Sequence, residues 1–425
     1  MDIGGKLSNR GLKKVKSLIK RIVLLFFVFI FQSCNFHEEN IIVKPMIPKE
    51  YEMAIGKIKY FVAPNSKLTS PIDGENRNAI YLLDFDGDKN GDIVYFIKTS
   101  DLFSPLKIGL IKSSSFINAV SYGFVGDEIH KFYYSDLDKD KKMEFIIGSY
   151  KNNSKEVFIL KEIEGILRVV FKSEYEDFAI NDIDGDGTDE ILLIRKDEFP
   201  FLNILKAEGE KFNSLYVVPL DKGTKHYKNI TYCKLNKSQN GIVIDSLIGE
   251  ELALTQILVL DKKKIKNLFL NSQNHICENG IKAYYIKSQD IDGDGFIEVA
   301  IPEINNSFQN ENIWINNWYK IDEKGNLIYS CSTYGDDSYY FLIPKKIQSN
   351  FIIKYNQKDY ESVSFYLKNS NKYLFSLYRI KEGKTIDLAD KIKILDYLNY
   401  RVYINYDKKI FNPDEIEKNI FINKE

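Results

Sequence analysis

The chain has 425 residues, of which 44% are hydrophobic and 28% charged, and it contains 28 tyrosines and 28 phenylalanines. This composition supports a folded core, excludes general disorder and favours strands, because aromatic side chains suit a pleated, half-buried surface. The formal net charge is −1, but residues 1–33 hold seven bases and one acid, so the remainder carries about −7. An acidic body argues against nucleic acid as a partner, since phosphate binding requires a basic face.

The N-terminus has the pattern of an export signal. Residues 6–21 are basic, residues 22–31 form an unbroken apolar run of ten, and Cys34 follows shortly after. As a helix this run spans only about 15 Å, half of a bilayer core, which disfavours a membrane-spanning anchor. We predict that residues 1–33 are a secretory signal peptide of the lipoprotein type.

The end of the apolar run resembles a bacterial lipobox, in which a cysteine directly after a small residue is lipidated and becomes the new N-terminus. Ser33 and Cys34 fit this pattern, whereas Phe31 and Gln32 depart from the leucine and small residue that it prefers. The resemblance implies lipidation of Cys34 and an extracytoplasmic protein anchored to the bacterial membrane, at the cell surface or in the periplasm. Residues 34–50 are polar and would form the tether. Simple secretion and an uncleaved anchor remain alternatives.

Three further cysteines, Cys233, Cys277 and Cys331, form no CxxC pair with one another or with Cys34. A zinc site therefore has no support. A disulfide between two of them stays open, because their spacing indicates no framework.

Four later segments share one acidic pattern, with acids at positions 1, 3, 5 and 9 followed by a run of mainly apolar residues. We name them loop 1 (84–92), loop 2 (136–144), loop 3 (182–190) and loop 4 (290–298). Their acids are Asp84, Asp86, Asp88 and Asp92; Asp136, Asp138, Asp140 and Glu144; Asp182, Asp184, Asp186 and Glu190; and Asp290, Asp292, Asp294 and Glu298.

Acids on alternate residues of a tight loop converge on one point, where they repel one another unless a cation joins them. Calcium prefers six to eight oxygen ligands, so we predict calcium in these loops. Gly187 and Gly295 at position 6 suit the sharp turn, whereas Lys89 and Lys141 occupy that position in loops 1 and 2. The alternative is a set of metal-free turns, since Asp and Gly form turns without an ion.

An EF-hand is excluded by the residues after the acids. Its loop needs a bidentate glutamate at position 12 and then a helix. Position 12 is Tyr95, Ile147, Leu193 or Ile301, and the residues that follow position 9 predict buried strands.

The loops begin 52, 46 and 108 residues apart, so the last interval has room for a hidden repeat. Residues 231–245 supply it, but their ligand positions hold Lys234, Asn236, Ser238 and Ile242, which predicts no calcium there. Five units of this length match propeller blades of four short strands.

These loops resemble the FG-GAP and VCBS-type repeats of integrin-like β-propellers. The resemblance implies a β-propeller over residues 51–334, with calcium held by a DxDxDG loop between two blade strands. The whole layout is similar to uncharacterised VCBS-repeat lipoproteins of low-GC Gram-positive bacteria, a group without an established activity.

Residues 335–425 lack acidic loops, and their alternating runs predict an antiparallel sheet. We also expect a helix over 386–398, a strand over 401–406 and a helix beginning at Asn412 and Pro413. The predicted fold class is therefore mainly β, a β-propeller followed by a small C-terminal α+β domain.

No GxSxG, HExxH or P-loop motif occurs, and the four histidines lie in unrelated settings. We predict that the protein is not an enzyme and that it binds a protein or glycan as a calcium-stabilised scaffolding module. The alternative is an envelope-associated enzyme that acts on polysaccharide or lipid, with the propeller as an accessory domain. A pocket in which several acids and a tyrosine or histidine converge, away from the loops, would favour that alternative.

Overall fold

The computed structural model describes residues 48–422 except 116–117, 262–263, 307–311, 337, 349, 358–360, 385–386 and 398. The predicted signal peptide, Cys34 and nearly all of the tether lie outside the described residues. The chain divides into two compact units, Met1–Tyr60 and Phe61–Glu425. Within the described residues, no helix has the length and apolar character needed to cross a bilayer.

The helix α2 (Lys49–Phe61) accounts for the described part of the first unit. Glu50 and Glu52 lie in its first turn and Lys59 lies in its last turn. This charge order suits the helix dipole, because the N-terminal end carries partial positive charge and the C-terminal end partial negative charge.

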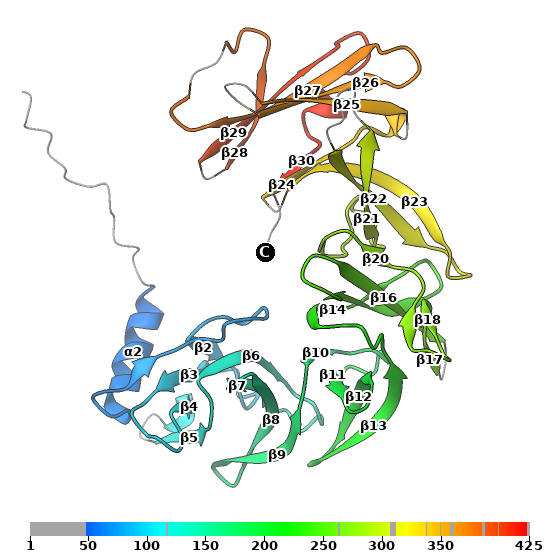
Figure 1. The fold of residues 1–425 in the computed structure, drawn as a ribbon. Helices are drawn as coiled ribbons and strands as arrows, with labels where there is room; N and C mark the ends of the chain where they lie inside the picture. Colours follow the sequence, from blue (N-terminus) through cyan, green and yellow to red (C-terminus); the bar gives the residue numbers. More distant parts are fainter. Residues whose placement is uncertain are drawn as a thin grey trace, which may run out of the picture. The chain divides into compact units, whose positions relative to one another are not determined.

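The second unit is mainly β, and its antiparallel sheets follow one another along the chain (Figure 1). The first sheet contains β1 (Lys67–Leu68), β2 (Ile80–Leu83), β3 (Asp92–Lys98), β4 (Leu106–Ile111) and β5 (Ala119–Phe124). The second contains β6 (Glu128–Ser135), β7 (Glu144–Lys151), β8 (Ser154–Ile163) and β9 (Ile166–Glu174). The third contains β10 (Asp177–Asn181), β11 (Glu190–Lys196), β12 (Pro200–Glu208) and β13 (Lys211–Pro219).

Three more large sheets and one short hairpin follow. The fourth sheet contains β14 (His226–Lys234), β15 (Asn240–Leu247), β16 (Ala253–Asp261), β17 (Lys264–Asn267) and β20 (Ile281–Lys282). The hairpin pairs β18 (Leu270–Asn271) with β19 (Ile276–Cys277). The fifth sheet contains β21 (Val299–Asn306), β22 (Asn312–Ile321), β23 (Leu327–Gly335), β24 (Tyr339–Leu342) and β30 (Ile420–Ile422). The sixth contains β25 (Phe351–Gln357), β26 (Glu361–Leu367), β27 (Tyr373–Lys381), β29 (Tyr400–Tyr406) and β28 (Ile392–Tyr397).

Alternate residues of the central strands pack against the sheets on either side. On β7, Phe145 and Ile147 join the core shared with the first sheet, and Ile146 joins the core shared with the third. On β15, Ile242 joins the core shared with the third sheet, and Val243 joins the core shared with the fifth sheet. Four-stranded meanders that bury both faces against their sequence neighbours are propeller-type blades, which confirms the predicted fold class.

The C-terminal segment contains one correction. The predicted helix over 386–398 is wrong, because Ile392–Tyr397 form the strand β28, which pairs with β29. Ile392 and Ile394 pack on the sixth sheet's core, so the apolar spacing that suggested a helix serves an extended strand instead. The strand predicted over 401–406 is confirmed as β29.

The helix start at Asn412 is also confirmed. The short helix α3 (Pro413–Ile416) has a capping box in which Glu415 N donates to Asn412 Oδ1 at 2.9 Å and Asn412 N donates to Glu415 Oε2 at 3.0 Å. The chain then returns as β30 and pairs with β24 in the fifth sheet. The predicted boundary at 334/335 falls at the last residue of β23.

Candidate metal centres

The same backbone hydrogen bond closes all four acidic loops. The N–H at position 2 donates to the carboxylate at position 9, as follows: Phe85 to Asp92 at 3.0 Å, Leu137 to Glu144 at 2.9 Å, Ile183 to Glu190 at 3.0 Å and Ile291 to Glu298 at 2.9 Å. All eight of these residues are buried. An apolar anchor and a buried acid thus fix each loop at the start of the strand that follows it, β3, β7, β11 or β21.

Lysine at position 6 does not change the turn. Lys89 and Lys141 have φ values of 68° and 72°, beside 86° for Gly187 and 88° for Gly295. All four loops therefore use the left-handed region at this position, although only glycine enters it without steric cost.

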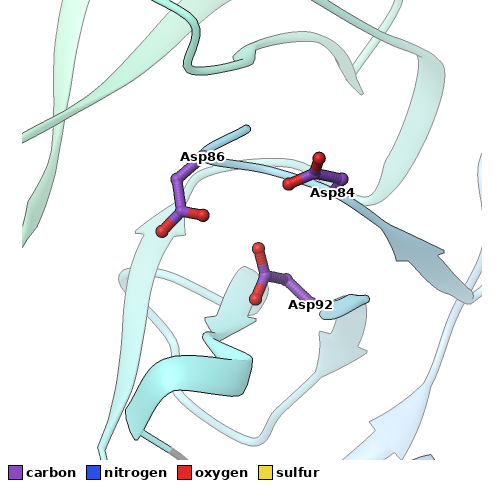
Figure 2. A group of neighbouring side chains, drawn as sticks. All are labelled: Asp84, Asp86 and Asp92. Carbon is purple, nitrogen blue, oxygen red and sulfur yellow. The ribbon is translucent and has the colours of Figure 1, made fainter. Parts of the chain in front are cut away.

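In each loop, oxygens of three carboxylates lie within 4.8 Å of one another, which is close enough to hold a metal ion. The groups are Asp84, Asp86 and Asp92; Asp136, Asp138 and Glu144; Asp182, Asp184 and Glu190; and Asp290, Asp292 and Asp294. Figure 2 shows the first group with its carboxylates turned toward one another. The other predicted ligands, Asp88, Asp140, Asp186 and Glu298, lie outside these groups.

A lysine ammonium lies among the acids of loops 2, 3 and 4. Lys206 Nζ is 2.6 Å from Asp184, 2.8 Å from Asp186 and 2.8 Å from Glu190. Lys206 thus contacts the acids at positions 3, 5 and 9 of loop 3, and the lysines at loops 2 and 4, described below, contact the acids at the same positions of their loops. The position-1 carboxylates instead accept backbone N–H groups of their own loops, as Asp182 does from Gly187 at 2.9 Å.

The other two ammonium groups repeat this arrangement. Lys161 pairs with Asp138, with Asp140 at 2.8 Å and with Glu144 at 3.2 Å. Lys320 lies 3.1 Å from Asp292, 2.5 Å from Asp294 and 3.2 Å from Glu298. These three lysines were not predicted, because strand register, and not sequence spacing, brings them to the loops.

Loop 1 differs, because only one of its three grouped acids has an ammonium nearby, and that ammonium pairs more closely with an acid outside the loop. Lys112 Nζ is 3.7 Å from Asp86 but 3.0 Å from Glu162 of the second sheet. The oxygens Asp84 Oδ1 and Asp86 Oδ1 are buried and have no hydrogen-bond partner among the described residues, as is also true of Asp138 Oδ1 in loop 2. Two orphaned buried oxygens beside a third carboxylate fit a cation ligand set, so the residues present at loop 1 suit a metal.

Burial makes the position-9 acids costly to ionise without a cation nearby. Desolvation raises the pKa of Glu144 to about 7 and that of Glu298 to about 7, against the opposing effects of backbone hydrogen bonds and lysines. Desolvation likewise raises the pKa of Glu190. A neighbouring positive charge is therefore part of how these loops stay folded with their acids ionised.

The hidden repeat is present as the fourth sheet. Residues 234–240 connect β14 to β15, and Leu235 is the buried anchor at position 2. Ser238 N donates to Asn236 Oδ1 at 3.0 Å, so polar turn contacts replace the acids of the other loops. None of the metal-binding groups found among the described residues lies here.

A second group of ionisable side chains lies in a cavity of about 400 Å³, away from the acidic loops. Its polar lining residues are Asp73, Glu75, Arg77, Asn78, Lys131, Tyr133, Lys228, Asn229, Tyr285 and Lys287. The buried Lys131 Nζ lies 2.5 Å from the buried Asp177 Oδ1 and 3.6 Å from Asp73 Oδ2. This cluster was not predicted, since no motif links the segment 71–78 to strands β6 and β10.

No family model matches the chain, and no curated protein matches it. Among solved structures, a rhamnogalacturonan lyase of Bacillus licheniformis is 12% identical with a TM-score of 0.30, over 70% of this chain and 60% of that one. TolB from Acinetobacter baumannii is 10% identical with a TM-score of 0.27, over 68% and 64%. A putative 6-phosphogluconolactonase from Bacteroides fragilis is 11% identical with a TM-score of 0.29, over 72% and 92%.

These similarities correct one prediction. Two of the three structures are enzymes by name, which contradicts the prediction that this chain is not an enzyme. That prediction was based on missing motifs, and catalytic groups assembled from distant strands need no motif. At such low identity and TM-score, the similarity does not assign either enzyme's activity to this chain.

Proposed function

We propose that the chain is an exported bacterial lipoprotein of the FG-GAP and VCBS-type propeller group, tethered through Cys34, which binds a protein or glycan through blades stabilised by calcium. The observation that carries the proposal is the acidic loop repeated at one place in successive blades, each with a buried position-9 acid. The tether and the export signal rest on the sequence of residues 1–50.

Thermal melting of the full chain tests the metal. We expect millimolar calcium to raise the melting temperature and a chelator to lower it again, because an ion that binds only the folded state stabilises it by linkage. Asp86→Asn should reduce the shift, whereas Asp101→Asn, in an exposed turn outside the loops, should leave it intact. No shift with calcium in the unaltered chain would refute the calcium part of the proposal.

Cell fractionation tests the anchor. The full chain should sediment with membranes, and Cys34→Ser should release it or leave it with an uncleaved signal peptide. Equal membrane association of both forms, with cleavage unchanged, would remove the lipid from the proposal.

Ligand capture tests the binding role. Immobilised protein would be exposed to envelope extract and to a glycan array, with calcium and with chelator. A ligand that is bound in calcium and released by chelator is expected. Absence of any ligand in both conditions would refute the binding role.

The enzyme alternative gains support from the second cavity, where acids, lysines and tyrosines converge away from the loops. Asp73, Lys131 and Tyr133 face a common space beside the buried Asp177 and His130. Such a cluster of buried ionisable groups in a cavity favours a site that acts on a ligand. Release of reducing ends or lipid headgroups from envelope material, lost in Tyr133→Phe, would favour this alternative; no release by the unaltered chain would count against it.

A further inference from the structure

One lysine occupies the same register position in each blade that has an acidic loop. In each of these blades, the residue after position 9 pairs with a residue on the next strand. The lysine directly follows that partner in the sequence. The pairs are Ile93 with Ile111, Phe145 with Leu160, Ile191 with Leu205 and Val299 with Tyr319, and the lysines are Lys112, Lys161, Lys206 and Lys320. Each lysine therefore lies on the neighbouring strand, opposite the buried acid at position 9 of the loop.

The fourth sheet has lost the acids and the lysine together. There Cys233, the residue before position 1, pairs with Gly241, and Gly241 pairs in turn with Val259. By register this loop is one residue shorter than the others, so Gly241, and not Ile242 as counted along the sequence, lies where the buried acid lies in the other blades, and Val259 lies where the lysine lies. The joint loss within one chain indicates that the two charges work as a unit.

In loops 2, 3 and 4 the ammonium lies where a metal ion would have to bind. An ammonium has three N–H donors, and each of the three lysines meets the acids at positions 3, 5 and 9, as described above. The ammonium thus occupies two of the three carboxylates of each candidate metal group, those at positions 3 and 9 in loops 2 and 3 and at positions 3 and 5 in loop 4. A divalent ion and an ammonium could not share that point, because like charges at such a distance repel strongly.

In loop 1 two features keep the ammonium away. Glu162 draws Lys112 to 3.0 Å, and it also accepts from Lys142 at 2.9 Å and from Gly165 N at 2.6 Å, so its position is fixed. Position 9 is Asp92, one methylene shorter than glutamate, and its Oδ1 accepts from Ser113 N at 2.6 Å. The loop's own acids are left to a cation from solution.

We infer that Lys161, Lys206 and Lys320 are built-in counter-ions that replace the metal in loops 2, 3 and 4, so that loop 1 alone takes calcium from solution. The inference rests on the proposed calcium binding and limits it to one blade. It departs from what the repeat resemblance implies, namely an ion in each acidic loop.

The first test counts the ions. Equilibrium dialysis of the full chain against calcium chloride, followed by elemental analysis, should give about one calcium per chain, and Asp86→Asn should reduce this to about zero. Three or four ions per chain would overturn the inference while leaving the proposed calcium binding intact. No bound calcium in any form of the chain would instead refute the proposed calcium binding.

The second test removes the ammonium groups one at a time. Lys161→Met, Lys206→Met and Lys320→Met keep most of the aliphatic length but not the charge, so each variant should bind one more calcium than the unaltered chain. Each should melt lower than the unaltered chain in chelator and recover in millimolar calcium, because the metal then replaces the lost charge. Lys112→Met is the matched comparison, since its ammonium contacts only one acid of its loop, Asp86 at 3.7 Å, and pairs more closely with Glu162, and it should leave the ion count unchanged.

Misfolding does not make the second test inconclusive. A variant that is unfolded in chelator but folds in calcium supports the inference. A variant that stays unfolded in calcium, or that folds and binds no additional ion, contradicts it, and Lys→Gln at the same position serves to confirm either result.

Discussion

The fourth sheet contains a buried ion pair between Asp245 of β15 and Lys282 of β20. Lys282 and Asp245 are each about 1% exposed, with Nζ and Oδ1 3.4 Å apart. Lys282 also donates to Ile286 O at 3.0 Å, and Asp245 accepts from Ser288 N at 2.8 Å. Burial lowers the pKa of Lys282, so its charge depends on these partners.

We predict that Lys282→Met lowers the free energy of unfolding by about 3–5 kcal/mol, because it leaves the buried Asp245 carboxylate without its counter-ion. Adding Asp245→Asn should recover part of the loss, since the stranded charge is then removed as well. Urea unfolding measures both, and Lys264→Met, exposed on β17 of the same sheet, is the control. A loss as small as that of the control would show that water or another cation compensates Asp245.

A pH effect is expected from His130. Burial, together with the nearby Lys155 and Lys131, lowers its pKa to about 3, although Asp73 opposes the shift. The unfolded chain binds a proton near the ordinary histidine pKa and the folded chain does not, so stability is lost as pH falls from about 6.5 toward 3. The loss from this residue between about pH 7 and pH 5.5 should be about 1 kcal/mol.

His130→Asn isolates that effect. Its unfolding free energy should fall less steeply with acid than that of the unaltered chain, whatever its value at neutral pH. His226→Asn, at an exposed position, should reproduce the steeper slope. Identical slopes in all three proteins would mean that His130 is protonated in the folded state.

At the scale of single residues, part of the candidate metal centres could be predicted from the sequence. Acids at positions 1, 3, 5 and 9 identified the loops, because the spacing itself produces the convergence. It could not predict Lys161, Lys206 or Lys320, since these residues meet the acids only through cross-strand register. The cluster around Lys131 was hidden for the same reason.

At the scale of the strand, glycines leave room for aromatic rings that lie against the sheet. Tyr95 on β3 lies over Gly109 on β4, its cross-strand partner, and a Cβ at residue 109 would be 2.1 Å from the Tyr95 ring. The second sheet has a similar arrangement, since a Cβ at Gly148 would be 2.2 Å from the Tyr175 hydroxyl. The aromatic side chain fills the space that the glycine leaves.

We predict that Gly109→Ala destabilises the protein by about 1–3 kcal/mol, as overpacking of a core does. Gly249→Ala is the control, because nothing lies within 4 Å of a Cβ built there and its φ is not in the left-handed region. Urea unfolding should separate the two variants. Equal stability would mean that Tyr95 can move aside at no cost.

Strand pairing also explains which elements were predictable. The acidic loops and the hidden repeat marked the blade positions correctly, because turns and buried anchors are local features. The segment at 386–398 was wrong, because its apolar residues fit a helix and a strand equally and pairing with β29 decided between them. Short apolar runs carry no information about their partner strands.

At the scale of the molecule, stability comes from the stacking of blades and not from covalent links. Cys233, Cys277 and Cys331 are free thiols, and Cys277 and Cys331 are fully enclosed. Burial raises the pKa of each of the three thiols to about 12. The disulfide that the sequence left open does not form in the described structure.

We predict that the three thiols resist a thiol-specific reagent at neutral pH in the folded protein and react after unfolding in urea. The reason is that the raised pKa keeps the reactive thiolate scarce at all three positions, and Cys277 and Cys331 are enclosed as well. A Cys34→Ser background restricts the count to these three, and a reductant should leave the melting temperature unchanged. Rapid labelling of the folded chain would show that a blade interface opens on the timescale of the reaction.

The late return of β30 to the fifth sheet has a consequence for solubility. β24 pairs with β23 on one side and with β30 on the other, so its backbone groups are covered. Trimming of the chain after β29 by a protease would uncover Tyr339–Leu342 as an aromatic edge without charge, the kind of edge that recruits strands from other molecules. Clipped protein should therefore self-associate while its remaining blades are still folded.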